Sequence, residues 1–430
     1  MERCLIKNLE ENKLSKISGM VSKIRDTKYM VFIVIKDRSG KIQVSIEKEG
    51  NELLVNEALK ITTGSIVEFN GIMKNSEYVK DGGKEFIPES INILSLSDTI
   101  PFEENANVDT KYDYRWIDLR SDKNEYTFKI QSEFVKYLRE FMYQNDFEEI
   151  HTPKLLGTAS ESGSSVFKVE YFDRDAYLAQ SPQFYKQMMI ASGAERVFEV
   201  APAFRAENSN TNRHCTEFTS FDVEMAYIDS YKDVMKFEQD LMIYALKKIK
   251  DKYGDIIKER YNTEVVVPEC DFPVIKLDDL LSELHNRYGY NIPEDDIGDM
   301  NAETEKLAYK YAMEEYNSEF IFVTHFSPSK RPFYHLRDEN GVPQGFDLIW
   351  RGMEITSGSQ REHRYDKLNI VAKEKGLGKD IEFYKEFFKY GCPPHGGFAI
   401  GVDRITMLLL NLEHVRDAQI LFRGPNRLNP

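Results

Sequence analysis

Residues 14–98 alternate apolar and polar positions in short runs. The runs occupy residues 30–35, 42–46, 65–69 and 91–94. Turn-forming residues separate them, for example at Asp37–Gly40 and Asp81–Gly83. Because successive side chains of a strand point to opposite faces, the pattern predicts about five short strands. Such strands form either a small closed barrel of the OB type or a generic antiparallel sheet, and their spacing favours neither.

The apolar pattern changes to a helical period after residue 125. Within residues 125–146 the apolar side chains are Phe128, Phe134, Leu138 and Met142. The rest of the chain alternates strands with helices, such as Arg196–Val200, Phe218–Met225 and Lys232–Ile249. Residues 250–320 are rich in Glu, Lys and Tyr at helical spacing. We therefore expect a mainly helical insertion there, with a solvated charged face.

A change in the sequence pattern suggests where one domain ends and the next begins. Pro101 and the acidic stretch Glu103–Asn107 separate the strand-rich region from the helical one. We expect a barrel domain over residues 1–98, a linker over 99–124 and a second domain over 125–430. A chain of 430 residues is long enough for two or three domains.

The formal net charge of −15 counts against a nucleic-acid partner, because phosphate binding favours basic surfaces. Net charge averages over the whole surface, however, whereas binding needs only a local basic or aromatic patch. An RNA partner therefore stays open.

The sequence shows no sign of secretion or of a membrane span. There is no run of about 18 apolar residues, and the N-terminal segment lacks the apolar stretch of a secretory signal. The cysteines Cys4, Cys215, Cys270 and Cys392 lie far apart and form no CxxC pair, which argues against a zinc knuckle or a disulfide framework. We expect a cytoplasmic protein with free thiols and no membrane partner.

The first segment with recognisable chemistry carries Arg205 and Glu207, followed by a polar loop, Asn208–His214, and a strand, Glu217–Met225. Residues two apart on a strand point to the same side, so the two side chains can face one ligand. The guanidinium can grip a phosphate through two hydrogen bonds, and the carboxylate can hold an amine. A surface hairpin with an exposed ion pair fits the segment equally well.

The second segment spans residues 346–361 and intersperses charged side chains with glycines. If it is a strand, Asp347 and Glu354 are two carboxylates of the kind that Mg²⁺ binds together with substrate phosphates. The glycines leave room for a ligand that approaches closely. A buried ion pair with Arg361 is the alternative, but so many charged groups are costly to bury without a ligand.

The third segment is a glycine-flanked strand, Gly396–Arg404, that runs into the apolar helix Ile405–Leu412. Arg404 at the junction can present a cation to a terminal phosphate. Such junctions occur in many α/β folds, so the segment is weak evidence alone. The evidence is stronger because three such segments occur in one chain.

In this order, the segments resemble motif 2, the intervening strand and motif 3 of the class II aminoacyl-tRNA synthetases. Tyr143–Pro153 is similar to the helix end, extended strand and proline of their motif 1. Arg115–Arg120 reads RWIDLR and resembles the RxxDLR of the aspartyl, asparaginyl and lysyl subgroup. The resemblance implies an N-terminal OB-fold β-barrel that binds the anticodon and a class II α+β catalytic domain built on an antiparallel sheet with flanking helices. It also implies a homodimer, because motif 1 forms a two-fold interface in this class.

Within the subgroup, the chain resembles the aspartyl-tRNA synthetases of the compact archaeal and eukaryotic type. Gln180–Gln187 reads QSPQFYKQ and matches their QSPQxxKQ, in which the lysine, here Lys186, suits an anionic substrate. The rival readings are an asparaginyl-tRNA synthetase, which usually lacks this lysine, and a paralogue that has lost tRNA charging. The C-terminal Arg427–Pro430 resembles the family's RLTP, whereas Phe422–Gly424 replaces the usual FPRD.

The resemblance implies an ATP-dependent reaction with Mg²⁺, in which L-aspartate forms aspartyl-adenylate and then passes to tRNA-Asp, with tRNA-Asn left open as a second acceptor. The expected ATP contacts are Arg205, Glu207, Arg213, His214, Phe218, Glu354 and Arg404. Three of these residues are expected to act in catalysis, namely Arg205, Glu207 and Arg404. The expected Mg²⁺ ligands are Asp347, Glu354 and Ser357.

The expected aspartate contacts are Glu161, Gln183, Lys186, Arg205, Asp222, Ser357 and Arg361. Lys186 and Arg361 would receive the substrate side-chain carboxylate, and Glu161 belongs to a segment, 161–165, that resembles the family's mobile loop. In the barrel, Phe32, Gln43 and Glu85 match the subgroup's anticodon contacts, which read single-stranded RNA by stacking and by bonds to base edges. A core position is the alternative for the phenylalanine.

Overall fold

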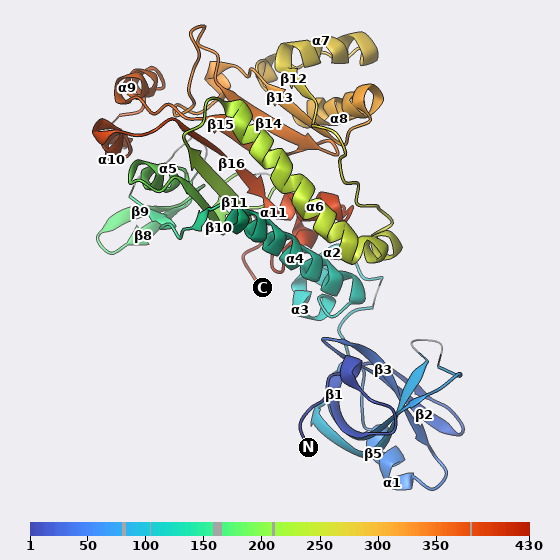
Figure 1. Ribbon diagram of the computed structural model, residues 1–430. Coiled ribbons are helices and arrows are strands. Elements are labelled where there is room, and N and C mark those ends of the chain that lie inside the picture. Colours follow the sequence, from blue (N-terminus) through green and yellow to red (C-terminus); the bar gives the residue numbers. More distant parts are fainter. Residues whose placement is uncertain (80–82, 104, 158–165, 209–210, 379–380) are drawn as a thin grey trace. The chain divides into compact units, whose positions relative to one another are not determined.

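A computed structural model describes the chain except for residues 80–82, 104, 158–165, 209–210 and 379–380. The chain forms two compact units, Met1–Lys111 and Tyr112–Pro430, which are both drawn in Figure 1. None of the helices in this described part combines the length and the apolar character that a bilayer crossing requires. The four cysteines are free thiols, as expected.

The first unit is a closed barrel with the strand order β1-β2-β3-β5-β4. Its strands are β1 (Leu14–Asp26), β2 (Met30–Asp37), β3 (Gly40–Glu47), β4 (Ile66–Asn75) and β5 (Lys84–Ser95), with helix α1 (Glu52–Ala58) between β3 and β4. Alternate residues of β2, namely Val31, Ile33 and Ile35, are fully buried because they point into the barrel. β1 pairs with both β2 and β4, which closes the sheet. The OB barrel is thus confirmed over the open sheet.

The second unit is built on one large sheet with the order β12-β13-β14-β15-β16-β11-β10-β6. Its strands are β6 (Glu148–Glu149), β10 (Arg196–Phe204), β11 (Glu217–Ala226), β12 (Val274–Lys276), β13 (Phe320–Thr324), β14 (Gly345–Trp350), β15 (Met353–Gln360) and β16 (His395–Gly401). Neighbours from β13 to β10 are antiparallel, whereas the edge strands β12 and β6 pair in parallel. A smaller sheet is formed by β7 (Leu155–Leu156), β9 (Arg174–Leu178) and β8 (Lys168–Tyr171).

Two long helices cover one face of the large sheet. α4 (Asp122–Gln144) begins after Ser121, whose hydroxyl caps the first turn, and α6 (Tyr231–Tyr261) begins with a capping box at Ser230. The two helices run side by side in Figure 1, and α11 (Val402–Leu409) joins their core. Sheet residues in this core include Phe198, Phe221, Val223, Phe346, Leu348, Phe398 and Ile400. The apolar face of the sheet is therefore closed to ligands.

The opposite face of the sheet carries small and polar residues. Directly paired residues of neighbouring antiparallel strands share a face. One row of pairs across the sheet consists of Glu199, Asp222, Ala399, Ser357 and Asp347. A second row consists of Glu224, Gly397, Ser359 and Gly345. Carboxylates and hydroxyls thus stand beside positions with little or no side chain, an arrangement that leaves space for a polar ligand.

The structure differs from the expected linker over residues 99–124. Helices α2 (Val108–Asp113) and α3 (Arg115–Asp118) form within it, and the second unit already begins at Tyr112. The buried Arg115 donates hydrogen bonds to the main-chain carbonyls of Asp417, Gln419 and Ile420. Local composition could not indicate this packing because the partners lie at the far end of the chain.

The region expected to be a helical insertion, residues 250–320, contains α7 (Leu277–Tyr288) and α8 (Ala302–Tyr316). Both helices pack on β13 through an apolar core. The region is therefore mainly helical, and it also supplies β12 to the edge of the large sheet. The remaining helices are α5 (Gln183–Ala191), α9 (Tyr365–Glu374) and α10 (Glu382–Glu386).

Candidate active site

Four charged side chains are buried together on the polar face of the sheet. Lys186 on α5 places its Nζ 3.2 Å from Asp222 Oδ1 and 3.3 Å from Glu224 Oε2. Arg361, just after β15, donates to Glu224 from Nε at 2.9 Å and from Nη2 at 3.3 Å. Each of these side chains is at most 4% exposed. Two cations and two anions thus form a neutral cluster, which we call the central quartet.

Glu224 joins the two cations of the central quartet. Burial by itself would raise its pKa, but Arg361 and Lys186 hold the pKa below its ordinary value. A Cβ at Gly397 would lie 2.5 Å from Glu224 Oε2, so glycine there makes room for the carboxylate. Sequence analysis missed Glu224, although its spacing of two from Asp222 on β11 predicts a common face.

A network of amides borders the central quartet. Gln183 donates to Gln187 Oε1 at 2.8 Å, and the same oxygen accepts a hydrogen bond from the Tyr384 hydroxyl at 3.0 Å. The amide of Gln187 lies 2.9 Å from His395 Nε2. Burial lowers the pKa of His395 to about 4, so its ring is neutral near pH 7. Gln183, expected at the substrate ammonium group, is here bonded within the protein.

Asp347, expected to bind Mg²⁺, forms an ion pair with Arg331. The guanidinium donates from Nη1 to Oδ1 at 3.0 Å and from Nη2 to Oδ2 at 2.5 Å, and Nη1 also lies 3.3 Å from Ser357 Oγ. Burial raises the pKa of Asp347 to about 7, although Arg331 acts in the opposite direction. Sequence analysis missed this arginine, because a cation in the loop between β13 and β14 follows no strand or helix pattern.

The segment that carries Asp347 is a hairpin and not one strand. β14 and β15 meet at Arg351 and Gly352, both of which have positive φ angles. Asp347 lies directly opposite Ser357, while Glu354 lies next to the turn. The two carboxylates therefore stand on neighbouring strands, which corrects the single-strand interpretation.

Arg404 lies close to Arg213 and Arg205, and we call these three side chains the arginine cluster. Arg404 Nη1 donates to the main-chain carbonyl of Glu354 at 2.8 Å, and Arg213 forms an ion pair with Glu305 on α8. Burial lowers the pKa of Arg404, and the proximity of Arg213 and Arg205 adds to this effect. Guanidinium groups this close together repel one another, and a polyphosphate would relieve the repulsion.

Arg205 and Glu207 lie beyond the end of β10, which finishes at Phe204, so the expectation that they share a strand is corrected. The guanidinium of Arg205 lies 5.2 Å from the centroid of the Phe218 ring, on the next strand. Burial and Arg404 lower the pKa of His214, whereas Glu207 raises it. The arginine cluster is therefore bordered by Glu207, His214 and Phe218.

The barrel brings Phe32, Gln43 and Glu85 onto neighbouring strands. Phe32 and Gln43 are partly exposed between buried neighbours, and Glu85 is partly exposed next to the buried Phe86, so all three point outward from the barrel. Gln43 pairs directly with Glu85, and Phe32 pairs with Ser45, two residues further along β3. The core alternative for Phe32 is wrong, because its ring lies on the outer surface under the guanidinium of Arg25.

The remaining expectations concern Glu161 and the metal. Glu161 and the segment 161–165 lie outside the described residues. Within the described part of the chain, no three His, Cys, Asp or Glu side chains are grouped as a metal site. Mg²⁺ commonly takes one or two carboxylates together with substrate phosphates, so the oxygen donors Asp347, Glu354 and Ser357 still fit this ion.

Comparisons with known proteins agree with this geometry. Residues 107–423 match the tRNA synthetases of class II (D, K and N), and residues 16–94 match the OB-fold nucleic acid binding domain. The Aspartate--tRNA(Asp/Asn) ligase of Aeropyrum pernix is 37% identical, over 96% of this chain and 95% of that protein. The Aspartate--tRNA(Asp) ligase of Pyrococcus furiosus is 39% identical, over 97% of this chain and 96% of that protein. The asparaginyl-tRNA synthetase of Pyrococcus horikoshii, solved with asparaginyl-adenylate, is 31% identical and superposes over all of both chains with a TM-score of 0.90. This chain therefore belongs to the class II tRNA synthetases of the D, K and N group and is a homologue of the aspartate–tRNA ligases.

Proposed function

We propose that the chain is an ATP-dependent aspartate–tRNA ligase. In the first step the α-carboxylate of L-aspartate attacks the α-phosphorus of ATP, and pyrophosphate leaves. In the second step the terminal adenosine hydroxyl of tRNA attacks the carbonyl of aspartyl-adenylate, and AMP leaves. No protein nucleophile is required, so catalysis rests on positioning and on charge stabilisation at the phosphates.

The observation that carries the proposal is that the central quartet lies on the polar face of the sheet, while Arg205 and Arg404 of the arginine cluster follow closely on the ends of its strands β10 and β16. Lys186 and Arg361 supply positive charge for the side-chain carboxylate of aspartate, and Asp222 supplies negative charge for its ammonium group. Arg205 would hold the α-carboxylate and the α-phosphate, and Arg404 the γ-phosphate. Phe218 offers a ring for stacking on adenine.

An asparaginyl-tRNA synthetase is the second candidate, because an enzyme of that kind shares the fold with a TM-score of 0.90. The buried Lys186 favours aspartate, because its positive charge attracts a carboxylate more strongly than a neutral amide. The fold alone does not separate the two substrates.

Asp347, Glu354 and Ser357 would hold Mg²⁺ together with the phosphates of ATP. The ion would supply positive charge to the phosphate oxygens during phosphoryl transfer. Arg331 keeps Asp347 in an ion pair, so this carboxylate is already oriented by the protein.

The barrel supports tRNA as the second substrate. Phe32, Gln43 and Glu85 form an outward-facing aromatic and polar row that suits unpaired anticodon bases. The relative from Aeropyrum pernix is named for both tRNA-Asp and tRNA-Asn, so we propose tRNA-Asp as the acceptor and treat tRNA-Asn as the acceptor to be tested. Aminoacylation of purified tRNA-Asp and tRNA-Asn transcripts tests this directly, and failure to charge tRNA-Asp would overturn the proposal.

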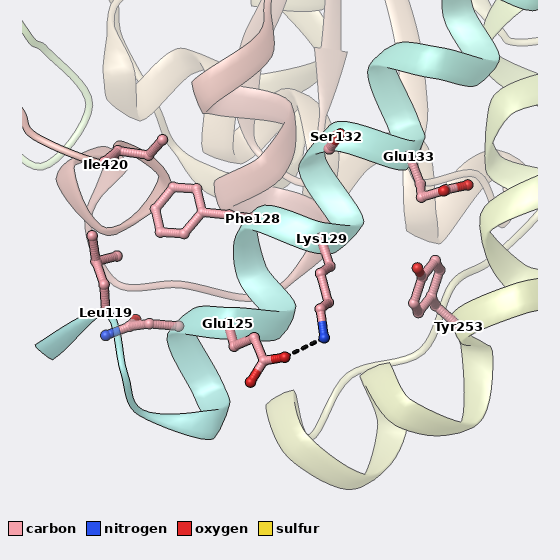
Figure 2. A pocket seen from close by; sticks show the side chains of 9 residues that line it. Leu119, Glu125, Phe128, Lys129, Ser132, Glu133, Tyr253 and Ile420 are labelled. Carbon is pink, nitrogen blue, oxygen red and sulfur yellow. Dashed lines mark hydrogen bonds and ion pairs between the residues drawn. The ribbon is translucent and has the colours of Figure 1, made fainter. Parts of the chain in front are cut away.

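A homodimer is part of the proposal. A groove of about 510 Å³ runs along α4 and is lined by Leu119, Phe128 and Ile420 and by Tyr253 from α6 (Figure 2). Ile420 is 57% exposed, and the ion pair between Glu125 and Lys129 borders the groove. Apolar surface of this kind at the motif 1 helix is what a second copy would cover.

A further inference from the structure

The region between residues 250 and 320 contributes an acidic side chain to the arginine cluster. Glu305, in the first turn of α8, is 5% exposed. Its Oε2 accepts hydrogen bonds from the guanidinium of Arg213 and, at 2.7 Å, from the main-chain N–H of Glu354. One carboxylate oxygen thus ties the loop before β11 to the start of β15.

Contacts around Glu305 fix the helix that carries it and the adjacent hairpin turn. The adjacent hairpin turn packs closely on α8, since a Cβ at Gly352 would lie 3.3 Å from Lys306 Cα. Arg351 in the same turn donates to Glu319 from Nε at 2.9 Å and from Nη2 at 3.0 Å. The side chain of Asn301 caps α8 by accepting two hydrogen bonds from first-turn amides. Both the helix and the turn that it supports are therefore fixed.

We propose that Glu305 is a positioning residue for ATP. It holds one guanidinium nitrogen of Arg213, and within the described part of the chain Nε and Nη1 of this arginine have no hydrogen-bond partner, so they are available to a phosphate. A guanidinium that is ordered before ATP arrives loses less conformational freedom on binding. The inference rests on the function proposed above, because it takes ATP as the ligand of the arginine cluster.

The reach of the side chain, and not its charge, is what this role requires. Both hydrogen bonds end on one oxygen, Oε2, so the geometry requires a single acceptor at that point. Glutamine has the same length and can accept both hydrogen bonds through one oxygen. Aspartate keeps the charge but is one methylene too short.

The test compares ATP affinity, measured by titration calorimetry with Mg²⁺ present, among full-length variants. Glu305→Asp should weaken ATP binding about tenfold, whereas Glu305→Gln should stay within about threefold of the native protein. Glu303→Asp is the matched control, since Glu303 lies on the same turn of α8 with its side chain 58% exposed, and it should bind ATP normally. Because Glu305 acts through Arg213, Arg213→Ala combined with Glu305→Asp should bind ATP no more weakly than Arg213→Ala alone.

Native affinity in Glu305→Asp would overturn the inference, as would additive losses in the double variant or a Glu305→Gln loss as large as that of Glu305→Asp. ATP binding is measured without amino acid or tRNA. A chain that binds ATP as described but shows no aspartate-dependent pyrophosphate exchange would therefore refute the proposed function and leave this inference standing.

Discussion

Arg361 and Glu224 form a two-pronged ion pair from which solvent is excluded, with Nε–Oε1 at 2.9 Å and Nη2–Oε2 at 3.3 Å. The guanidinium expected to receive the substrate carboxylate therefore already has an internal partner. Lys186 is likewise paired, with Asp222. In the proposed reaction the aspartate side chain therefore enters beside these carboxylates and shares their cations, so that selectivity depends on the balance of charge in the central quartet.

This balance predicts the behaviour of Arg361→Leu. The variant should lose aspartate activation by orders of magnitude while ATP affinity changes only a few-fold, because the proposed function assigns the phosphates to other arginines. The measurement is the KM for aspartate and the KM for ATP in pyrophosphate exchange. Lys186→Leu should show the same split to a smaller degree.

Loss of a buried partner also costs stability, by about 3–5 kcal/mol, because Glu224 keeps only Lys186 as a counter-charge. The ratio of the two KM values is the internal control. Partial unfolding lowers the fraction of active protein but does not change the KM for aspartate relative to the KM for ATP. Equal increases in both KM values would contradict the assignment of Arg361 to the amino acid.

Arg205→Ala should nearly abolish pyrophosphate exchange. A single preorganised charge on the transition state is worth about 3 kcal/mol or more, and no other residue is expected at both the α-phosphate and the α-carboxylate. The side chain is exposed and lies beyond β10, so the variant should fold normally, as circular dichroism can check. Exchange within a few-fold of the native rate would remove Arg205 from the site.

Glu238 on α6 should make the protein less stable as the pH rises. Its carboxyl group is fully buried, and among the described residues neither oxygen meets the geometry of a hydrogen bond. Burial raises its pKa from 4.5 to about 8, against a smaller lowering effect of the Thr356 hydroxyl. Between these pH values the folded chain binds more protons than the unfolded chain, so stability falls as pH rises.

Glu238→Gln removes this titration while nearly preserving shape. We compare the free energy of unfolding of the variant with that of the native protein. The variant's value minus the native value should increase by a few kcal/mol between about pH 5 and about pH 8. Denaturant unfolding at both pH values measures the difference, in which all other titrating groups cancel. A difference that is constant with pH would show that Glu238 does not carry the raised pKa.

The groove along α4 predicts how the dimer can be broken. The native chain should be a dimer at micromolar concentration, and Ile420→Asp should shift it towards monomer by placing a charge in the covered apolar surface. Ile370→Asp on α9 is the matched control, because this isoleucine is similarly exposed, at 53%, but lies outside the groove. Sedimentation analysis of the three proteins distinguishes the outcomes, and a native monomer with full activity would refute the dimer.

Local patterns predicted the elements well but not the contacts between them. The helix expected over 125–146 is α4, and the alternation in residues 14–98 gave the barrel strands, because both depend on periods within one segment. Arg331 and Glu305 could not be found in this way, since each acquires its role from a partner on a distant element.

Two other differences between the predicted and the observed site lie at the ends of strands, where the alternation of side chains along a strand no longer applies. The sequence pattern puts Asp347 and Glu354 along one strand, because Gly352 suits close approach of a ligand as well as it suits a turn. The pattern likewise puts Arg205 and Glu207 on a strand, which in the structure ends just before them, at Phe204. In each case the residue types were informative, while their arrangement required the three-dimensional structure.

The choice of aspartate is tested most directly by pyrophosphate exchange with aspartate and with asparagine as alternative substrates. The two amino acids are nearly the same in shape, so a preference must come from the charges around Lys186 and Arg361. We predict that kcat/KM for aspartate exceeds that for asparagine by at least about 100-fold. A native protein that activates asparagine better than aspartate would contradict the account and make the chain an asparaginyl-tRNA synthetase.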